Sequence, residues 1–189
     1  LPERRVVSTV TASQQLANAC EALGLEYVTT PVGFKWIYGE MEKGGVLVGG
    51  EESGGIGLPG HVKERDGLLM ALLLTEMMAK EGKDLGQLVE DANDRFGRFA
   101  FTRRGLRLEP AQEAKADVAL KGQRLPEEVL GKAIARTDQR DGLKLILENG
   151  SWVMMRKSGT EPLVRIYAEA PTDEVVEALL DWAEGFLLA

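Results

Sequence analysis

The chain has 189 residues, 44% of them hydrophobic and 28% charged, which is enough for one or two globular domains with real cores. Its net charge of −7 argues against non-specific binding to nucleic acid or to an anionic membrane. Neither a run of 18 apolar residues nor a basic-then-apolar signal segment occurs, so we expect a soluble cytoplasmic protein. The single cysteine, Cys20, excludes an internal disulfide, and the single histidine, His61, has no partner that the sequence identifies.

The first 30 residues predict a βαβ unit. Arg5–Val10 and Glu26–Thr30 have the composition of strands. Between them, Ser13–Leu23 has the apolar spacing of an amphipathic helix, which Gly24 ends. Two strands joined through a helix in this way are parallel, so the pattern indicates a parallel sheet.

The next segments extend this α/β layer. Lys35–Lys43 predicts a short helix, and Val46–Val48 predicts a buried strand. Asp66–Lys80 is apolar nearly all round, which predicts a buried helix rather than a cofactor-binding segment. An i, i+3, i+4, i+7 stripe over residues 85–92 predicts a further helix.

The pattern changes near Phe96, where strand-like segments become more frequent. The predicted elements are a strand at Phe99–Leu108, a helix at Pro126–Ile134, a hairpin of Leu143–Leu147 and Ser151–Arg156 about Asn149-Gly150, a strand at Leu163–Tyr167 and a final helix from Asp173 to about Phe186. We therefore expect an α/β domain with a parallel or mixed sheet over residues 1–95. A smaller α+β domain with an antiparallel sheet is expected over residues 96–189.

The loop Arg156–Pro162 lies between two predicted strands and has the chemistry of a phosphate cradle. Arg156 offers paired N–H donors, Ser158 and Thr160 offer hydroxyl donors, and Gly159 lets backbone amides approach an anion closely. An exposed polar turn is the alternative for such a loop.

A second loop, Gly49–Gly57, follows a predicted strand and has complementary chemistry. Glu51 and Glu52 stand beside Ser53, and carboxylates accept hydrogen bonds from adjacent hydroxyls of a polyhydroxylated ligand. A flexible glycine loop with solvated acids is the alternative. Together the two loops suggest one ligand with a sugar end and a phosphate end.

Lys35 is a third candidate. It stands at the start of a predicted helix, where the helix dipole does not favour a cation. An ammonium group near a bound phosphate would explain its position. An equally good alternative is a lysine whose stem covers Trp36 while its head stays in water.

Five arginines cluster near the domain boundary. Contact with an anionic ligand is one interpretation, but the flanking carboxylates favour a solvated strand and turn face. The residues are Arg95, Arg98, Arg103, Arg104 and Arg107.

Taken together, these segments resemble the carboxy-terminal half of the α-D-phosphohexomutases, the phosphoglucomutase/phosphomannomutase family. The matching segments are Gly33-Phe34-Lys35-Trp36, Gly50-Glu51-Glu52-Ser53-Gly54-Gly55, Arg65-Asp66-Gly67 and Arg156-Lys157-Ser158-Gly159-Thr160-Glu161-Pro162. The family has four domains around a central cleft. The resemblance covers most of the third, sugar-binding domain and all of the fourth, phosphate-binding domain.

The resemblance implies a role for each matching position. Glu51 and Ser53 would bind the hexose hydroxyls, and Lys35 would point into the active cleft as a possible catalytic residue. The non-transferring phosphate would be held by Arg156, Ser158, Gly159 and Thr160. No metal ligand is implied within this chain.

The resemblance also implies a reaction for the complete enzyme. A phosphoserine would donate its phosphoryl group to a hexose phosphate, and the bisphosphate would then turn over and return its other group. Mg²⁺ and hexose 1,6-bisphosphate would be the cofactors. The partners would be the hexose phosphate and the missing amino-terminal domains of the same chain, and neither nucleic acid nor membrane.

The family's nucleophile and metal loops have no match here. Thr11-Ala12-Ser13-Gln14 imitates the serine loop but lacks the His-Asn that follows it, so we expect Thr11 or Ser13 to cap a helix. Asp138 and Asp141 do not form an Asp-x-Asp-x-Asp run. We expect the segment alone to be inactive. Because it begins with Leu1 just before a strand, we also expect it to be part of a longer protein.

The leading hypothesis is the recognition part of a mutase for glucose or mannose phosphates, which Gly33-Phe34-Lys35-Trp36 favours weakly. A phosphoglucosamine mutase is the alternative within the family, because the loop at Arg156–Pro162 does not distinguish them. A non-catalytic sugar-phosphate binding module is the alternative from another class.

Overall fold

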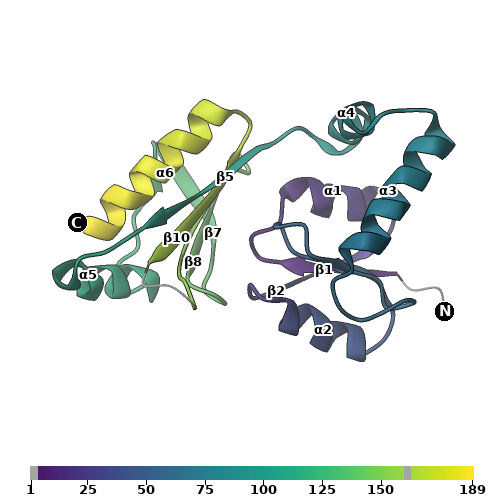
Figure 1. The fold of residues 1–189 in the computed structure, drawn as a ribbon. Helices are drawn as coiled ribbons and strands as arrows, with labels where there is room; N and C mark the ends of the chain where they lie inside the picture. The colour runs from purple at the N-terminus through teal and green to yellow at the C-terminus, as the bar shows by residue number, and fades with distance from the viewer. Residues whose placement is uncertain (1–3, 160–162) are drawn as a thin grey trace. The chain divides into compact units, whose positions relative to one another are not determined.

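The two kinds of sequence pattern fold into two separate units, Leu1–Arg98 and Phe99–Ala189 (Figure 1). The computed structural model describes residues 4–159 and 163–189. The first unit is an α/β layer with a mixed sheet, and the second has an antiparallel sheet, so the expected fold class is confirmed.

The first unit is built on a sheet whose strands lie in the order β2-β1-β3-β4. Strand β1 pairs in parallel with β2 and β3, which confirms the βαβ unit, and β4 runs antiparallel to β3. Helices α1 and α2 lie on opposite faces of this sheet (Figure 1). In chain order the elements are β1 (Arg5–Thr9), α1 (Gln14–Ala22), β2 (Glu26–Thr30), α2 (Phe34–Glu42), β3 (Val46–Gly50), β4 (Ile56–Gly57), α3 (Gly67–Glu81) and α4 (Leu85–Phe96).

Local signals explain how the first unit begins its helices and closes its core. The Ser13 hydroxyl accepts a hydrogen bond from the Gln15 amide at 3.1 Å, so the expected N-cap of α1 is confirmed. Helix α2 packs on the sheet so closely that a Cβ at Gly49 would lie 2.4 Å from Ile37. The buried core contains Val7, Phe34, Ile37, Met41 and Val46. Gly49 on β3 therefore allows α2 to pack closely against the sheet.

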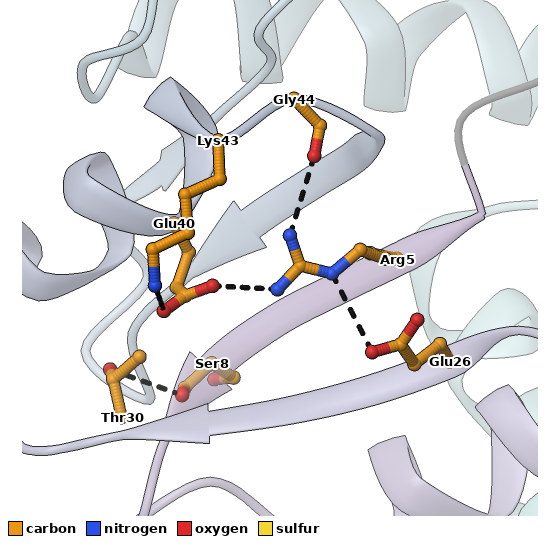
Figure 2. Close-up of polar contacts among 7 residues, drawn as sticks. All are labelled: Arg5, Ser8, Glu26, Thr30, Glu40, Lys43 and Gly44. Carbon is orange, nitrogen blue, oxygen red and sulfur yellow. Dashed lines mark hydrogen bonds and ion pairs between the residues drawn. The ribbon is translucent and has the colours of Figure 1, made fainter.

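Arg5 joins the amino ends of the strands to α2 (Figure 2). Its guanidinium lies 2.6 Å from Glu40, donates to the Gly44 carbonyl at 3.3 Å and lies 3.6 Å from Glu26. Hydrogen bonds from Lys43 and Arg5 hold the pKa of the Glu40 carboxyl below its usual range. This network fixes one end of the sheet and leaves the opposite, carboxyl end to the polar loops.

Helix α3 departs most from the fold expected from sequence. The all-round apolar pattern predicts a buried helix, yet none of its residues is buried, and Leu68 is 75% exposed. That prediction is wrong for this chain, because the neighbour of α3 is α4, which covers too little of it. Strand β3 is likewise only partly buried: Val46 is inside, whereas Leu47 is exposed.

The second unit has an antiparallel sheet with strands in the order β5-β10-β9-β8-β7-β6. Helices α5 and α6 pack on one face of it and share a core with alternate residues of β8, β9 and β10 (Figure 1). In chain order the elements are β5 (Ala100–Leu106), α5 (Pro110–Leu120), β6 (Glu128–Val129), β7 (Lys132–Asp138), β8 (Leu143–Leu147), β9 (Trp152–Lys157), β10 (Val164–Ala170) and α6 (Asp173–Leu188).

One turn and one helix cap of the second unit follow their sequence signals. The Asn149-Gly150 hairpin is confirmed, with Gly150 at φ +83 and its amide bonded to the Leu147 carbonyl at 2.9 Å. The Thr172 hydroxyl accepts from the Val175 amide, so the predicted start of the final helix is confirmed. Strands β9 and β10 pair directly, which places the predicted phosphate loop between them.

The predicted helix at Pro126–Ile134 is wrong, because β6 and β7 form a hairpin there. Leu130 and Gly131 form its turn, with φ of 52 and 71, and two successive positive φ values are typical of a type I′ turn. The helix lies earlier instead, at α5, where Pro110 occupies the first turn and Glu109 and Gln112 form a capping box.

Leu130→Asn should stabilise the second unit, raising its free energy of unfolding by roughly 0.5–1 kcal/mol. Asparagine tolerates the left-handed conformation that leucine holds here, and Leu130 is about half exposed, so little packing is lost. Urea unfolding measures the change. Leu125→Asn is the matched control, because Leu125 is equally exposed without a positive φ. Equal effects of the two substitutions would contradict this account.

Candidate functional site

The loop between β3 and β4 is a tight, closed structure. The Glu51 amide donates to the Gly55 carbonyl at 2.9 Å, and the Gly54 amide donates to the Glu51 carbonyl at 3.0 Å. Gly54 has φ +91, a conformation that favours glycine. The alternative of a loose glycine loop therefore does not describe this segment, which holds its glutamates in place.

Glu51 is the buried acid of this loop. Its side chain is only 10% exposed, and its carboxylate lies 3.5 Å from the Arg65 guanidinium. Burial raises the pKa of the Glu51 carboxyl, while Arg65 and a hydrogen bond from the Gly33 amide oppose that rise. A carboxylate held in this way is a fixed acceptor for hydroxyl donors.

Arg65 owes its position to two glycines. A Cβ at Gly55 would lie 2.6 Å from Cδ of Arg65, and one at Gly57 would lie 2.8 Å from the Glu64 carbonyl oxygen. The Arg65 guanidinium also lies 5.1 Å from the ring centroid of Phe34. The sequence pattern assigns Arg65 no role of its own, since only the fold brings it to Glu51.

Glu52 contacts threonines at the carboxyl end of β1. It accepts hydrogen bonds from the Thr11 hydroxyl at 2.8 Å and the Thr9 hydroxyl at 3.2 Å. Both threonines are fully buried. Thr11, considered from sequence as a possible cap, is therefore an anchor for the loop, while Ser13 is the cap.

Ser53 and Lys35 are exposed side chains of the first unit. Ser53 lies at the tip of the loop, between Glu52 and Gly54. Lys35 lies in the first turn of α2, and its ammonium is 5.0 Å from the ring centroid of Trp36. That contact fits the alternative in which the Lys35 stem covers Trp36, and it leaves the ammonium group accessible.

His61 has a partner that sequence could not identify. Its Nε2 lies 2.9 Å from the Asp66 carboxylate. Asp66 also caps α3 by accepting from the Leu69 amide at 2.9 Å. The Leu69 amide and His61 together hold the pKa of the Asp66 carboxyl below its usual range. The pair therefore has a structural role at the start of α3.

The predicted phosphate loop joins β9 to β10 in the second unit. Ser158 donates its amide to the Leu163 carbonyl at 2.9 Å, which closes the base of the loop. Gly159 follows and is exposed. Thr160, also predicted to bind phosphate, lies outside the described residues.

Arg156 is held in place beside a cavity of about 420 Å³. Its side chain is 14% exposed, and its Nε donates to Asp141 at 2.9 Å. Lys157 lies 2.6 Å from Asp117 on the same cavity wall. The bond from its Nε to Asp141 orients the Arg156 guanidinium, a group whose planar fork is suited to binding an anion.

Strand register adds Arg165 to this region. On β10 it lies directly opposite Arg156 of β9 and Gly105 of β5, so the two arginines project from the same face of the sheet. A hollow of about 270 Å³ is lined by Arg103, Arg104, Gly105, Leu163 and Arg165. Arg165 is not among the residues predicted from sequence to bind phosphate, although its place just after the loop, on an adjacent strand, is a signal that could have identified it.

The arginine cluster divides into different roles. Arg104 lies on the helix-covered face, within 3.0 Å of carboxylates from Glu177, Asp181 and Glu184 of α6. These hydrogen bonds raise the pKa of its guanidinium above the usual range. Arg103 and Arg104 both line the hollow described above. The interpretation of the whole cluster as a solvated face is therefore wrong at Arg104.

The part of the chain that the structure describes contains neither a metal cluster nor a membrane helix. In the described ranges 4–159 and 163–189, no three His, Cys, Asp or Glu side chains gather as a metal site would require. No helix of the same ranges is long and apolar enough to cross a membrane.

Known relatives resemble nearly the whole chain but are much longer. A phosphoglucosamine mutase of Carboxydothermus hydrogenoformans is 33% identical over 181 residues, which are 96% of this chain and 36% of that protein. A phosphoglucomutase/phosphomannomutase of Thermococcus kodakarensis is 31% identical over 176 residues, 93% of this chain and 36% of that protein. The chain thus spans about a third of the length of these relatives.

Solved structures and family descriptions agree with this likeness. A crystal structure from Thermus thermophilus, described as a phosphomannomutase, superposes with a TM-score of 0.79 at 36% identity, covering 99% of this chain and 37% of that one. Residues 1–96 match the phosphoglucomutase/phosphomannomutase alpha/beta/alpha domain III, and residues 103–182 match the phosphoglucomutase/phosphomannomutase C-terminal domain. The chain belongs to the phosphoglucomutase/phosphomannomutase family and comprises its third and carboxy-terminal domains.

Proposed function

We propose that this chain is the substrate-recognition part of a phosphohexomutase that interconverts hexose 1-phosphate and hexose 6-phosphate, with glucose or mannose as the sugar. The proposal rests on two loops, each of which holds a charged side chain in place. One holds a buried carboxylate, Glu51, and the other holds Arg156 opposite Arg165. Each loop stands in a domain that matches the family.

The proposed roles follow from the chemistry of each loop. Glu51 accepts hydrogen bonds from the sugar hydroxyls while Arg65 keeps its carboxylate in place, and Ser53 contributes a hydroxyl from the loop tip. Arg156 supplies paired charge-assisted hydrogen bonds to the phosphate. Ser158, Gly159 and Thr160 complete the phosphate loop in this proposal, and Lys35 steers phosphate or moves a proton.

The phosphoryl-transfer chemistry is assigned to the rest of the polypeptide. In the proposal a phosphoserine there donates to the substrate, a hexose 1,6-bisphosphate forms, and Mg²⁺ neutralises the developing charge. The described residues do not fit a metal site, so no step of this chain is routed through the metal. We therefore expect this chain alone to bind substrate without turning it over.

A second candidate is the same reaction on glucosamine phosphate. Relatives named phosphoglucosamine mutase at 33% identity favour it. Assays of the complete polypeptide with glucose 1-phosphate, mannose 1-phosphate and glucosamine 1-phosphate rank the three sugars. Preference for the amino sugar would overturn our choice, and no turnover of any would favour a non-catalytic sugar-phosphate binding module.

Arg156→Ala should weaken binding of glucose 1-phosphate to the 189-residue chain by about tenfold, since charge-assisted hydrogen bonds to phosphate are lost. Lys35→Ala should weaken it less, because its ammonium is solvated. Isothermal titration measures both. We expect weak affinity throughout, because a partial site makes too few contacts to offset the free-energy cost of association.

Arg136→Ala is the matched control for this titration. Arg136 is an exposed arginine on β7 of the same sheet, so its removal changes the net charge equally. Circular dichroism checks that the Arg156 variant keeps its fold after the bond between Arg156 and Asp141 is lost. Equal affinities of the Arg156 and Arg136 variants would remove the phosphate assignment.

A further inference from the structure

Backbone groups of the first unit help to hold the Glu51 carboxylate and its loop. The Gly33 amide donates a hydrogen bond to this carboxylate. The loop around it is closed from the Glu51 amide to the Gly55 carbonyl at 2.9 Å, and from the Gly54 amide to the Glu51 carbonyl at 3.0 Å. Glu51 is thus held from several sides, and the positive charge of Arg65 adds something that these neutral contacts do not supply.

The fold places the charge of Arg65 against Glu51. One terminal nitrogen of its guanidinium lies 3.5 Å from the Glu51 carboxylate, and its Nε donates to Glu64 at 3.0 Å. The guanidinium also lies 5.1 Å from the ring centroid of Phe34, while Gly55 leaves room for its Cδ. The Arg65 side chain is nonetheless 53% exposed, so its guanidinium is accessible to a ligand that binds Glu51.

Three glutamates influence the charge at this loop. Burial raises the pKa of the Glu51 carboxyl, and Arg65 lowers it. The charges of Glu52 and Glu64 raise it further. Three neighbouring carboxylates attract a cationic ligand, and the guanidinium of Arg65 reduces that attraction.

The candidate sugars of the proposed function differ in charge at one carbon. Glucose and mannose carry a neutral hydroxyl at C2, whereas glucosamine carries an amine that is largely protonated near neutral pH. A carboxylate accepts hydrogen bonds from both groups. A guanidinium beside that carboxylate repels only the ammonium. Substituents of one sugar ring lie close together, so this repulsion acts even where another hydroxyl of the ring makes the contact with Glu51.

We propose that Arg65 is a specificity-determining residue, which makes the Glu51 loop favour neutral hexose phosphates over the cationic amino sugar phosphate. The inference rests on the proposed function, because it requires the Glu51 loop to bind the sugar. It concerns the change in relative preference that Arg65 causes, whichever sugar the enzyme turns over fastest. A purely structural role of Arg65 would instead affect all the sugars alike.

Arg65→Gln in the complete polypeptide tests this role through kcat/KM for glucose 1-phosphate, mannose 1-phosphate and glucosamine 1-phosphate. The ratio of glucosamine to glucose should rise about tenfold, a modest value because the half-exposed Arg65 is screened by water. The ratio of mannose to glucose should stay within about twofold, because both sugars are neutral. Contacts with the phosphate and any general loss of activity cancel in both ratios.

Two further variants separate the charge of Arg65 from its shape and from net charge. Arg65→Lys keeps the positive charge and should keep the ratio of glucosamine to glucose within about threefold of the unmodified enzyme. Lys63→Gln is the matched control, because it removes a charge two residues away that pairs with Glu42 at 2.7 Å. It should leave the ratio unchanged.

The outcomes separate this inference from the proposed function. An unchanged ratio in Arg65→Gln, with the sugars still turned over, would overturn the inference and leave the proposed function intact. An equal rise in Arg65→Lys or in Lys63→Gln would also overturn it, since the charge beside Glu51 would not be the cause. If the unmodified polypeptide turns over none of the three sugar phosphates, the proposed function fails and this inference fails with it.

Discussion

Gly142→Ala is expected to lower the free energy of unfolding of the second unit by about 3 kcal/mol or more. Gly142 has φ +94, which is strained for any residue with a side chain. A Cβ there would also lie 2.3 Å from the Met155 carbonyl oxygen and 2.8 Å from Cβ of Arg156. Met155 lies in the sheet core, so relief requires moving the backbone of β9 rather than turning a side chain.

The same substitution should disturb phosphate binding. Displacement of β9 at Arg156 lengthens its 2.9 Å hydrogen bond to Asp141, which orients the guanidinium. Urea unfolding measures the loss of stability, and titration with glucose 1-phosphate measures the loss of affinity, which should exceed about fivefold.

Gly150→Ala is the control that separates backbone strain at a positive φ from a steric clash of the added Cβ. Gly150 has a similar φ, +83, but a Cβ there would have no atom within 4 Å. Its replacement should cost only about 1 kcal/mol, from backbone conformation alone. If the two alanine variants lose the same stability, the contact with Met155 does not govern the Gly142 effect.

Elements with signals at both ends were predictable from sequence. Helix α1 has Ser13 at its start and Gly24 just beyond its end, and the hairpin of β8 and β9 has Asn149-Gly150. In each case the side chain or glycine acts within a few residues of the backbone that it controls. Local structure of this kind can therefore be predicted from the sequence.

The hairpin at Leu130-Gly131 was not predictable in this way. Leucine is not a usual residue for a left-handed turn, so the segment after Pro126 resembles a helix start. Pairing of β7 with β8 overrides that local preference for a helix. Strand β7 adds to a sheet that packs through one face against α5 and α6. Tertiary strand pairing therefore decides the structure of this segment, and no local sequence pattern indicates that pairing.

The site shows the same division. Glu51, Ser53 and Arg156 could be proposed from residue type and loop position alone. Arg65 could not, because its contact with Glu51 depends on two glycines that let the chain fold back. Arg165 needed the strand register that places it opposite Arg156. Residue type and loop position thus suggest candidate groups for the chemistry, whereas the groups that position them can be found only from the fold.

The stability of the second unit is expected to rise by about 3 kcal/mol between about pH 8 and pH 10.5, because of Lys144. Desolvation by burial lowers the pKa of this lysine from 10.5 to about 8. Glu169 and Asp138 oppose that shift, while Arg136 and Arg140 add to it. Its ammonium lies only 3.7 Å from the ring centroid of Trp152.

The direction of this change in stability with pH follows from the number of protons that the folded and unfolded states bind. Between about pH 8 and 10.5 the unfolded chain holds a proton on Lys144 that the folded chain has released, so raising the pH favours folding. Below about pH 8 both states are charged and the folded state bears the full cost of burying the ammonium. Above pH 10.5 both are neutral and that cost is gone.

Lys144→Met should remove this slope, because a neutral side chain of similar length has no proton to release. Urea unfolding at about pH 7.5, 9 and 10.5 measures the difference between the variant and the unmodified chain. Other groups that titrate in the range cancel in this difference.

Lys132→Met on the neighbouring strand β7 is the control, since Lys132 is exposed and its charge stays in water in both states. It should keep the full slope. A Lys144 variant that retains the slope would show that the ammonium beside Trp152 is hydrated. The face of the sheet opposite α5 and α6 would then be open to water at Lys144, despite the burial of Trp152 and Glu169 there.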